Sequence, residues 1–247
     1  MELIAGYSLL QIAAALLATL GSAFVRGLTG FGMAILLVPV LALALQPVES
    51  VLLANFLSLF IGLSEIRRLV SNAEHSAWII SGLVVLATPL GLLALAATAP
   101  ALARFLIALI ALSAFGAILL PRRPAAVPGA VMTGSVGVVS GLLTGYAGMP
   151  GPPVVPYYVG RHIARDTAKA SMMLIFTFAA MAGITSGAVI GLLESRIALL
   201  AAALFPAVLL GNWLGHRASG RISDPVWHGF VGLMLGGAAL AAFVRLV

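Results

Sequence analysis

Two short stretches rich in glycine and proline interrupt an otherwise apolar chain, and they resemble one another. The first break, residues 26–33, reads RGLTGFGM, and the second break, residues 141–153, reads GLLTGYAGMPGPP. Glycine costs about 1 kcal/mol and proline about 3 kcal/mol in a helix interior, so each stretch should interrupt a helix. In lipid, such an interruption is tolerated only where the backbone lines a cavity or is buried in protein. Matching interruptions in two halves of a membrane chain indicate a transporter binding site.

The composition places the chain in a membrane. Of its 247 residues, 62% are hydrophobic and 8% are charged, whereas a soluble domain carries about 25% charged residues. The chain therefore reads as one multi-pass integral membrane domain. The net charge of +6 is typical of loops held in the cytoplasm and does not indicate nucleic-acid binding. The chain has no cysteine, which excludes disulfides, thiolate metal ligands and a cysteine nucleophile.

Ten apolar segments follow one another along the chain. We expect them at roughly residues 5–25, 31–46, 49–66, 76–98, 101–120, 127–145, 149–160, 168–193, 197–215 and 226–246. No basic residue precedes the first segment, which favours a permanent helix over a cleaved signal. Most segments approach the ~20 residues that a helix needs to span the bilayer. The second and seventh, which follow the two breaks, are shorter and are candidates for half-helices that enter and return.

The chain divides into two related halves, residues 1–123 and 124–247, at the loop that contains Pro121 and Pro124. Thr29-Gly30 of the first break corresponds to Thr144-Gly145 of the second, in register with further pairs along the halves. When each loop is numbered by the apolar segment that it follows, ten basic residues lie in the odd-numbered loops and three lie elsewhere. The positive-inside rule then places the odd loops in the cytoplasm and favours an even number of passes at each break, either two crossings or an in-and-out hairpin. The expected fold is all-α, with two inverted repeats of about five segments each and a site at the midplane.

At this point the motifs resemble those of the sulfite exporter TauE/SafE family, also called the toluene-sulfonate uptake permease family. Gly27–Gly32 with Pro39 carries the resemblance in the first half, and Gly145–Pro153 carries it in the second. The resemblance covers nearly the whole chain. It implies an inner-membrane transporter of small sulfur-containing anions such as sulfite or sulfonates, built from eight spans where the charge count favours ten passes.

An anion that crosses hydrocarbon needs hydrogen-bond donors and a fixed cation in place of water. The breaks supply backbone N–H groups, and Arg26 is the cation within them, although it would serve equally as a cytoplasmic anchor. Asn55 would face the pathway or bond a neighbouring helix, and Phe31 and Tyr146 would gate the site or simply pack. The expected substrate contacts are Arg26, Thr29, Gly30, Phe31, Gly32, Asn55, Thr144, Gly145, Tyr146, Gly148, Met149 and Pro150.

The function that these observations favour is transport of a small sulfur-containing anion across the inner membrane, most simply export. An anion channel, or a permease for a small carboxylate or another oxyanion, remains an alternative. No metal-ligand cluster or catalytic dyad lies in mid-membrane, so we expect neither an enzyme nor a cofactor or metal. The expected partners are the substrate and the lipid bilayer, with no nucleic acid, and homodimer formation is left open.

Overall fold

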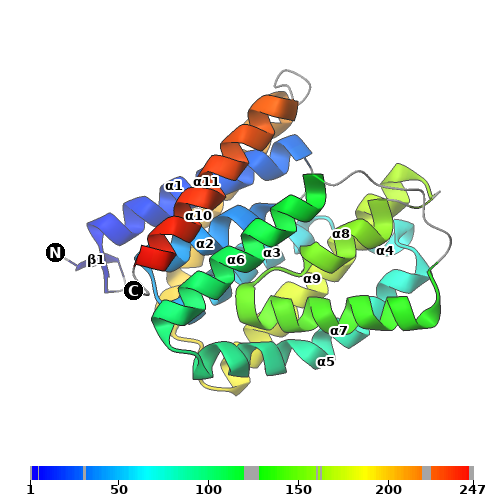
Figure 1. Cartoon of the computed structure of the whole chain (residues 1–247), viewed down its shortest axis with the longest axis horizontal. Coiled ribbons are helices and arrows are strands. Elements are labelled where there is room, and N and C mark those ends of the chain that lie inside the picture. Colours follow the sequence, from blue (N-terminus) through cyan, green and yellow to red (C-terminus); the bar gives the residue numbers. More distant parts are fainter. Residues whose placement is uncertain are drawn as a thin grey trace.

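The computed structural model describes residues 2–4, 6–29, 32–119, 128–159, 161, 163–218 and 224–244 (Figure 1). In this described part the chain is helical apart from one small hairpin. The elements in chain order are β1 (Glu2–Ile4), β2 (Tyr7–Ser8), α1 (Leu9–Thr29), α2 (Met33–Ala44), α3 (Pro47–Ser64), α4 (Ile66–Asn72), α5 (His75–Ala97), α6 (Pro100–Leu119), α7 (Ala130–Ala147), α8 (Gly151–Val159), α9 (Arg165–Val189), α10 (Ser195–Ala218) and α11 (Asp224–Val244). Each of the ten expected apolar segments corresponds to one helix, which confirms the all-α class.

The N-terminus differs from the expectation. Strands β1 and β2 pair antiparallel, so the first helix begins at Leu9 rather than near residue 5. Ser8 and Gln11 form a capping box there. The Gln11 N–H donates to Ser8 Oγ at 3.3 Å, and the Ser8 N–H donates to Gln11 Oε1 at 2.9 Å. A Ser-x-x-Gln sequence is a recognised helix start, and here it overrides the apolar run. The short helix α4 between α3 and α5 was also not expected.

The outer surface and the helix lengths identify a multi-pass membrane protein. Among the described residues, α1, α3, α5, α7, α9 and α10 are long and apolar enough to cross a bilayer. Large apolar side chains point outward, and Val131, Leu10 and Leu86 are 85%, 79% and 74% exposed. Soluble monomers rarely expose large continuous apolar surfaces. Lipid is the solvent in which such a surface is stable.

Both breaks are the turns of helical hairpins. Near the start of α1, Gln11 Nε2 donates to the carbonyl of Ala44, the last residue of α2, at 3.1 Å. Near the start of α7, the Thr133 hydroxyl lies 2.8 Å from the Tyr157 hydroxyl near the end of α8. Each short helix therefore folds back along the helix before it, and neither break is a kink in one long helix. At 12 and 9 residues, α2 and α8 reach only about 18 Å and 14 Å, less than the ~30 Å hydrocarbon core.

The first helix of each half packs along the helix of the fourth apolar segment of the other half. Gly27 of α1 lies against Gly215 of α10, and Gly145 of α7 lies against Thr88 and Leu92 of α5, so closely that a Cβ at either glycine would overlap the backbone opposite. Figure 1 shows α5 and α7 side by side. Glycines spaced four apart form these contacts, namely Gly137, Gly141 and Gly145 on α7 and Gly211 and Gly215 on α10. Small residues permit this approach, which drives association in lipid.

Helix α9 runs through the centre of the molecule, and its contacts show whether α3 and α5 run parallel or antiparallel to it. It lies antiparallel to α3, because Gly187 faces Leu52 of α3 whereas Thr177 faces Gly62. It runs parallel to α5. Ser171 Oγ of α9 accepts a hydrogen bond from the N–H of Glu74, directly before α5, at 2.9 Å. Further toward the C-terminal end of both helices, the ring of Trp78 on α5 contacts the ring of Phe178 on α9.

Ion pairs join the two halves at opposite ends of α9. At its N-terminal end, Arg161 makes a two-pronged pair with Glu74 at 2.7 and 2.6 Å, and its side chain is 7% exposed. Hydrogen bonding to Glu74 raises the pKa of Arg161 above its already high ordinary value. At the other end, Arg196 of α10 pairs with Glu49 of α3 at 2.5 Å. In each pair, one partner comes from the first half and the other from the second half.

Candidate functional site

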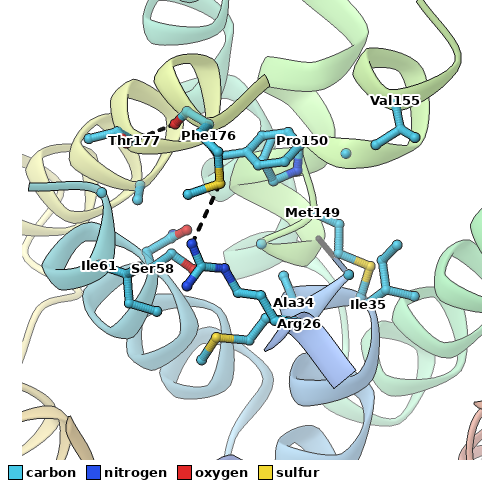
Figure 2. A pocket seen from close by; sticks show the side chains of 18 residues that line it. Arg26, Ala34, Ile35, Ser58, Ile61, Met149, Pro150, Val155, Phe176 and Thr177 are labelled. Carbon is cyan, nitrogen blue, oxygen red and sulfur yellow. Dashed lines mark hydrogen bonds between the residues drawn. The ribbon is translucent and has the colours of Figure 1, made fainter. Parts of the chain in front are cut away.

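A cavity of ≈ 70 Å³ lies where the two hairpin turns meet α3 and α9 (Figure 2). It is bounded by Arg26 from α1, by the start of α2, by the second break and by the facing sides of α3 and α9. Its described lining residues are Arg26, Gly32, Met33, Ala34, Ile35, Asn55, Ser58, Ile61, Gly62, Gly148, Met149, Pro150, Gly151, Val155, Met173, Phe176, Thr177 and Ala180. Since one water needs about 10–15 Å³ by this kind of measure, the space suits a few waters or one small ion.

The cavity lies half-way between the two ion pairs. Thr177 is the central residue of α9 (Arg165–Val189), and it lines the cavity. Because the Glu74–Arg161 and Glu49–Arg196 pairs mark the two ends of α9, the cavity lies at mid-height of the helix bundle. If α9 crosses the bilayer, this height corresponds to its middle.

Arg26 is in the last turn of α1, and its guanidinium points into the cavity beside Ser58 (Figure 2). Nη2 donates to the thioether sulfur of Met173 at 3.5 Å. Nη1 is buried and makes no hydrogen bond to any described residue. A thioether is a weak acceptor, and an unpaired N–H of a buried cation is costly. The charged end of Arg26 is thus left with unused hydrogen-bonding capacity that faces the cavity.

Asn55 contributes a second free donor. It lies on α3, is 2% exposed, and lines the cavity. Its Nδ2 is buried without a hydrogen-bond partner among the described residues. The amide packs against Gly183 of α9, where a Cβ would overlap it. Of the two roles expected from the sequence, the amide nitrogen does not form a bond to a neighbouring helix in the described part of the chain.

The second break is shaped by one left-handed glycine. Gly148 has φ 67°, and it ends α7 as a left-handed glycine cap. Its N–H donates to the Thr144 carbonyl at 2.9 Å, and the Met149 N–H donates to the Leu143 carbonyl at 3.2 Å. These two backbone donors are therefore used inside the protein. The residues Pro150, Pro152 and Pro153 carry no N–H, which leaves Gly151 as the main donor at the start of α8.

The first break presents more backbone donors. Gly32 has φ 89° and precedes α2, and the first-turn residues Met33, Ala34 and Ile35 line the cavity with it. The first N–H groups of a helix have no partner within that helix. The start of α2 therefore faces the cavity with groups that can bind an anion.

The structure places the expected site residues in three groups. Six of them, Arg26, Gly32, Asn55, Gly148, Met149 and Pro150, line the cavity. Three lie elsewhere: the Thr144 hydroxyl bonds the Ser140 carbonyl at 2.7 Å, Gly145 packs against α5, and the Tyr146 hydroxyl donates to Thr98 Oγ1 at 3.3 Å. Of the rest, Gly30 and Phe31 lie outside the described residues, and Thr29 is described only as the last residue of α1.

Sequence reasoning missed the sides of α3 and α9 that complete the cavity. Ser58 and Gly62 follow Asn55 by three and seven residues, so helical periodicity alone would have placed them on one face. Met173, Phe176, Thr177 and Ala180 have the same spacing on α9. No comparable polar anchor marked α9, because Thr177 bonds its own helix at the Met173 carbonyl, 2.8 Å away.

The cavity holds no carboxylate among its described lining residues, and in the part of the chain that the structure describes no three His, Cys, Asp or Glu side chains could hold a metal ion. Fold and cavity together define a multi-pass helical membrane protein in which the turns of two helical hairpins meet at a central cavity. The sulfite exporter TauE/SafE family model matches residues 14–242, and the chain belongs to that family. It is a membrane transporter of sulfite or a related anion. No curated protein and no solved structure matches the chain significantly.

Proposed function

We propose that the central cavity is the substrate site and that the protein exports a small sulfur-containing oxyanion, sulfite or a short sulfonate, across the inner membrane. Two buried donors, Arg26 Nη1 and Asn55 Nδ2, carry this proposal, because neither has a hydrogen-bond partner among the described residues. The described lining of the cavity holds no acid. The family description names sulfite export, which supports the direction. The proposal holds for a monomer and for a homodimer.

Binding would complete the hydrogen bonds that these donors lack. An oxyanion beside Arg26 would accept two parallel N–H bonds from the guanidinium, with the Met173 thioether giving up the weak bond that it now accepts. A third oxygen would accept from the Asn55 amide. Sulfite and sulfonates each carry three oxygens on one sulfur, which matches three donors around a small space.

The ion pairs on either side of the cavity favour a carrier over an open channel. The Glu74–Arg161 and Glu49–Arg196 pairs join the halves on either side of the cavity. Substrate that leaves the cavity must pass one end or the other. A carrier with a midplane site opens its two ends in turn, and these pairs lie where such opening would occur.

We also propose that the two halves are inverted repeats. Several contacts support this: the hairpins at both breaks, the exchanged packing of α1 with α10 and of α7 with α5, and the antiparallel arrangement of α3 and α9. Because α3 and α9 are the third segments of their halves, inverted halves would orient them oppositely, whereas eight continuous spans would make them parallel.

Cysteine labelling in cells would test the topology, since the natural chain has no cysteine. We expect Ser71→Cys, Ala125→Cys and Ser219→Cys to react only from the cytoplasm and Ala99→Cys only from the opposite side. Ser71 and Ala99 are exposed, whereas Ala125 and Ser219 lie outside the described residues. Reaction of the cysteines at 71 and 219 from opposite sides would contradict the inverted arrangement.

Flux into proteoliposomes would test the function itself. We expect saturable uptake of sulfite and methanesulfonate, absent from protein-free vesicles and strongly reduced by Arg26→Gln. A linear, non-saturating flux would identify a channel. Uptake of acetate or another small carboxylate, without uptake of any sulfur oxyanion, would overturn the proposed substrate class.

A further inference from the structure

The cavity has an unusual charge balance for a site that would receive an oxyanion. Arg26 is the one charged side chain among its described lining residues. The nearest break residues that lie outside the described part, Gly30 and Phe31, carry no charge. The Glu74–Arg161 and Glu49–Arg196 ion pairs are remote, at the two ends of α9. Glu65, the residue directly after α3, is the acid whose charge acts on Arg26, but it lies outside the described cavity lining and is paired with Arg68.

Helix dipoles do not change this balance. The positive N-terminal ends of α2 and α8 face the cavity, and each is equivalent to about half a charge. Each hairpin turn, however, also brings the negative C-terminal end of the preceding helix, α1 or α7, to the same place. Two positive and two negative ends of similar size largely cancel. The fixed charge that an anion meets is therefore close to the single unit of Arg26.

Apart from Asn55, Ser58 and Thr177, the remaining side chains of the described wall are apolar. Met33, Met149, Met173, Phe176, Val155 and Ile61 line the cavity, and they offer nothing to a second negative charge. A charge that is desolvated at mid-membrane without a partner is strongly disfavoured, whereas a methyl group against thioethers and a ring gains from its burial.

From this balance we infer that the cavity selects monovalent sulfur oxyanions, and above all those with one small apolar group, over divalent ones. Methanesulfonate and hydrogen sulfite fit this description, whereas sulfate, fully ionised sulfite and sulfoacetate do not. The inference rests on the proposed function, because it takes the cavity as the substrate site. It narrows that function to a charge class and adds that sulfite would be recognised in its singly protonated form.

Competition binding on the purified, detergent-solubilised protein would test this inference. We expect methanesulfonate to bind about 100-fold more tightly than sulfate or sulfoacetate, from the cost of an unpaired charge at this depth. Sulfite should bind more weakly as the pH rises through its second ionisation, while methanesulfonate, which stays monovalent, should not change. Equal or tighter binding of sulfate or sulfoacetate would overturn the inference and leave the proposed function intact. Binding of none of these anions would overturn both.

A variant that adds a second positive charge to the cavity wall would test the inference in the opposite direction. Lysine resembles methionine in length and lack of branching, so Met173→Lys would place a second positive charge beside Arg26 with little change in shape. We expect the ratio of sulfate affinity to methanesulfonate affinity to rise at least tenfold in a variant that elutes as a folded protein. An unchanged ratio, with both anions still bound, would show that wall charge does not set the selectivity and would count against the inference.

Discussion

Replacing Arg26 with glutamine should weaken binding of methanesulfonate or sulfite by about 10- to 100-fold, which corresponds to roughly 1.5–3 kcal/mol for a hydrogen bond to a charged group. The reason is geometric as well as electrostatic, because Nη1 has no described partner and Nη2 has only the Met173 sulfur at 3.5 Å. Arg26→Lys should recover only part of the affinity, since a point charge cannot form two parallel bonds. Titration of the purified variants would measure both effects.

Arg104→Gln is a suitable control for the loss of a partly buried arginine. Arg104 donates from Nε to the Ala42 carbonyl at 2.6 Å and does not line the cavity. Its replacement should leave anion affinity unchanged, whatever it does to stability. If Arg26 were only a cytoplasmic anchor, then arginine, lysine and glutamine at position 26 would bind equally well. Equal affinities in folded protein would remove Arg26 from the site.

Gly145→Val should lower the stability of the solubilised protein by at least about 1–3 kcal/mol, the cost of overpacking a close-packed interior. A Cβ there would overlap the Thr88 carbonyl and the Leu92 amide of α5, and α5 and α7 would have to separate along a close contact that joins the two halves. The sequence predicted Gly145 as a substrate contact. The structure supports packing, because Gly145 does not line the cavity.

Gly134→Val on the same helix serves as the matched control. No heavy atom lies within 4 Å of the position that a Cβ at Gly134 would occupy. This variant should melt close to the natural protein and keep its transport activity. Thermal unfolding followed by size-exclusion chromatography would compare the two. A Gly145→Val protein as stable as Gly134→Val would contradict the proposed tight contact between α5 and α7.

Much of the fold could be predicted because a membrane restricts what a chain can do. Apolar segments of the right length have to be helices in lipid, and every expected segment corresponds to one. The glycines and prolines of the two breaks located the hairpin turns, since Gly148 takes the left-handed conformation and proline cannot continue α7. The start of α1 was misplaced because the hydropathy signal outweighed a four-residue capping box at Ser8.

The cavity could be predicted only in part. Arg26 and Asn55 stood out because a charged or amide side chain in an apolar segment needs a reason to be there. Thr144 stood out because it corresponds to Thr29 in the paired breaks, yet its hydroxyl is satisfied within its own helix by the Ser140 carbonyl, a bond that hydropathy does not reveal. Met173 and Phe176 looked like ordinary apolar residues, because nothing local distinguishes a lipid-facing, a packed and a cavity-lining side chain.

The sequence by itself determined the membrane environment, the two interruptions and the family motifs, since each depends on local composition and backbone preference. Only the tertiary structure decided which polar groups remain without partners. Whether Arg26 is an anchor or a binding group depends on what lies within hydrogen-bonding distance of its guanidinium. That neighbour, Met173, is 147 residues away in the chain. It comes close because α3 and α9 cross antiparallel at glycines that let their backbones approach, and this approach places one cation among apolar walls.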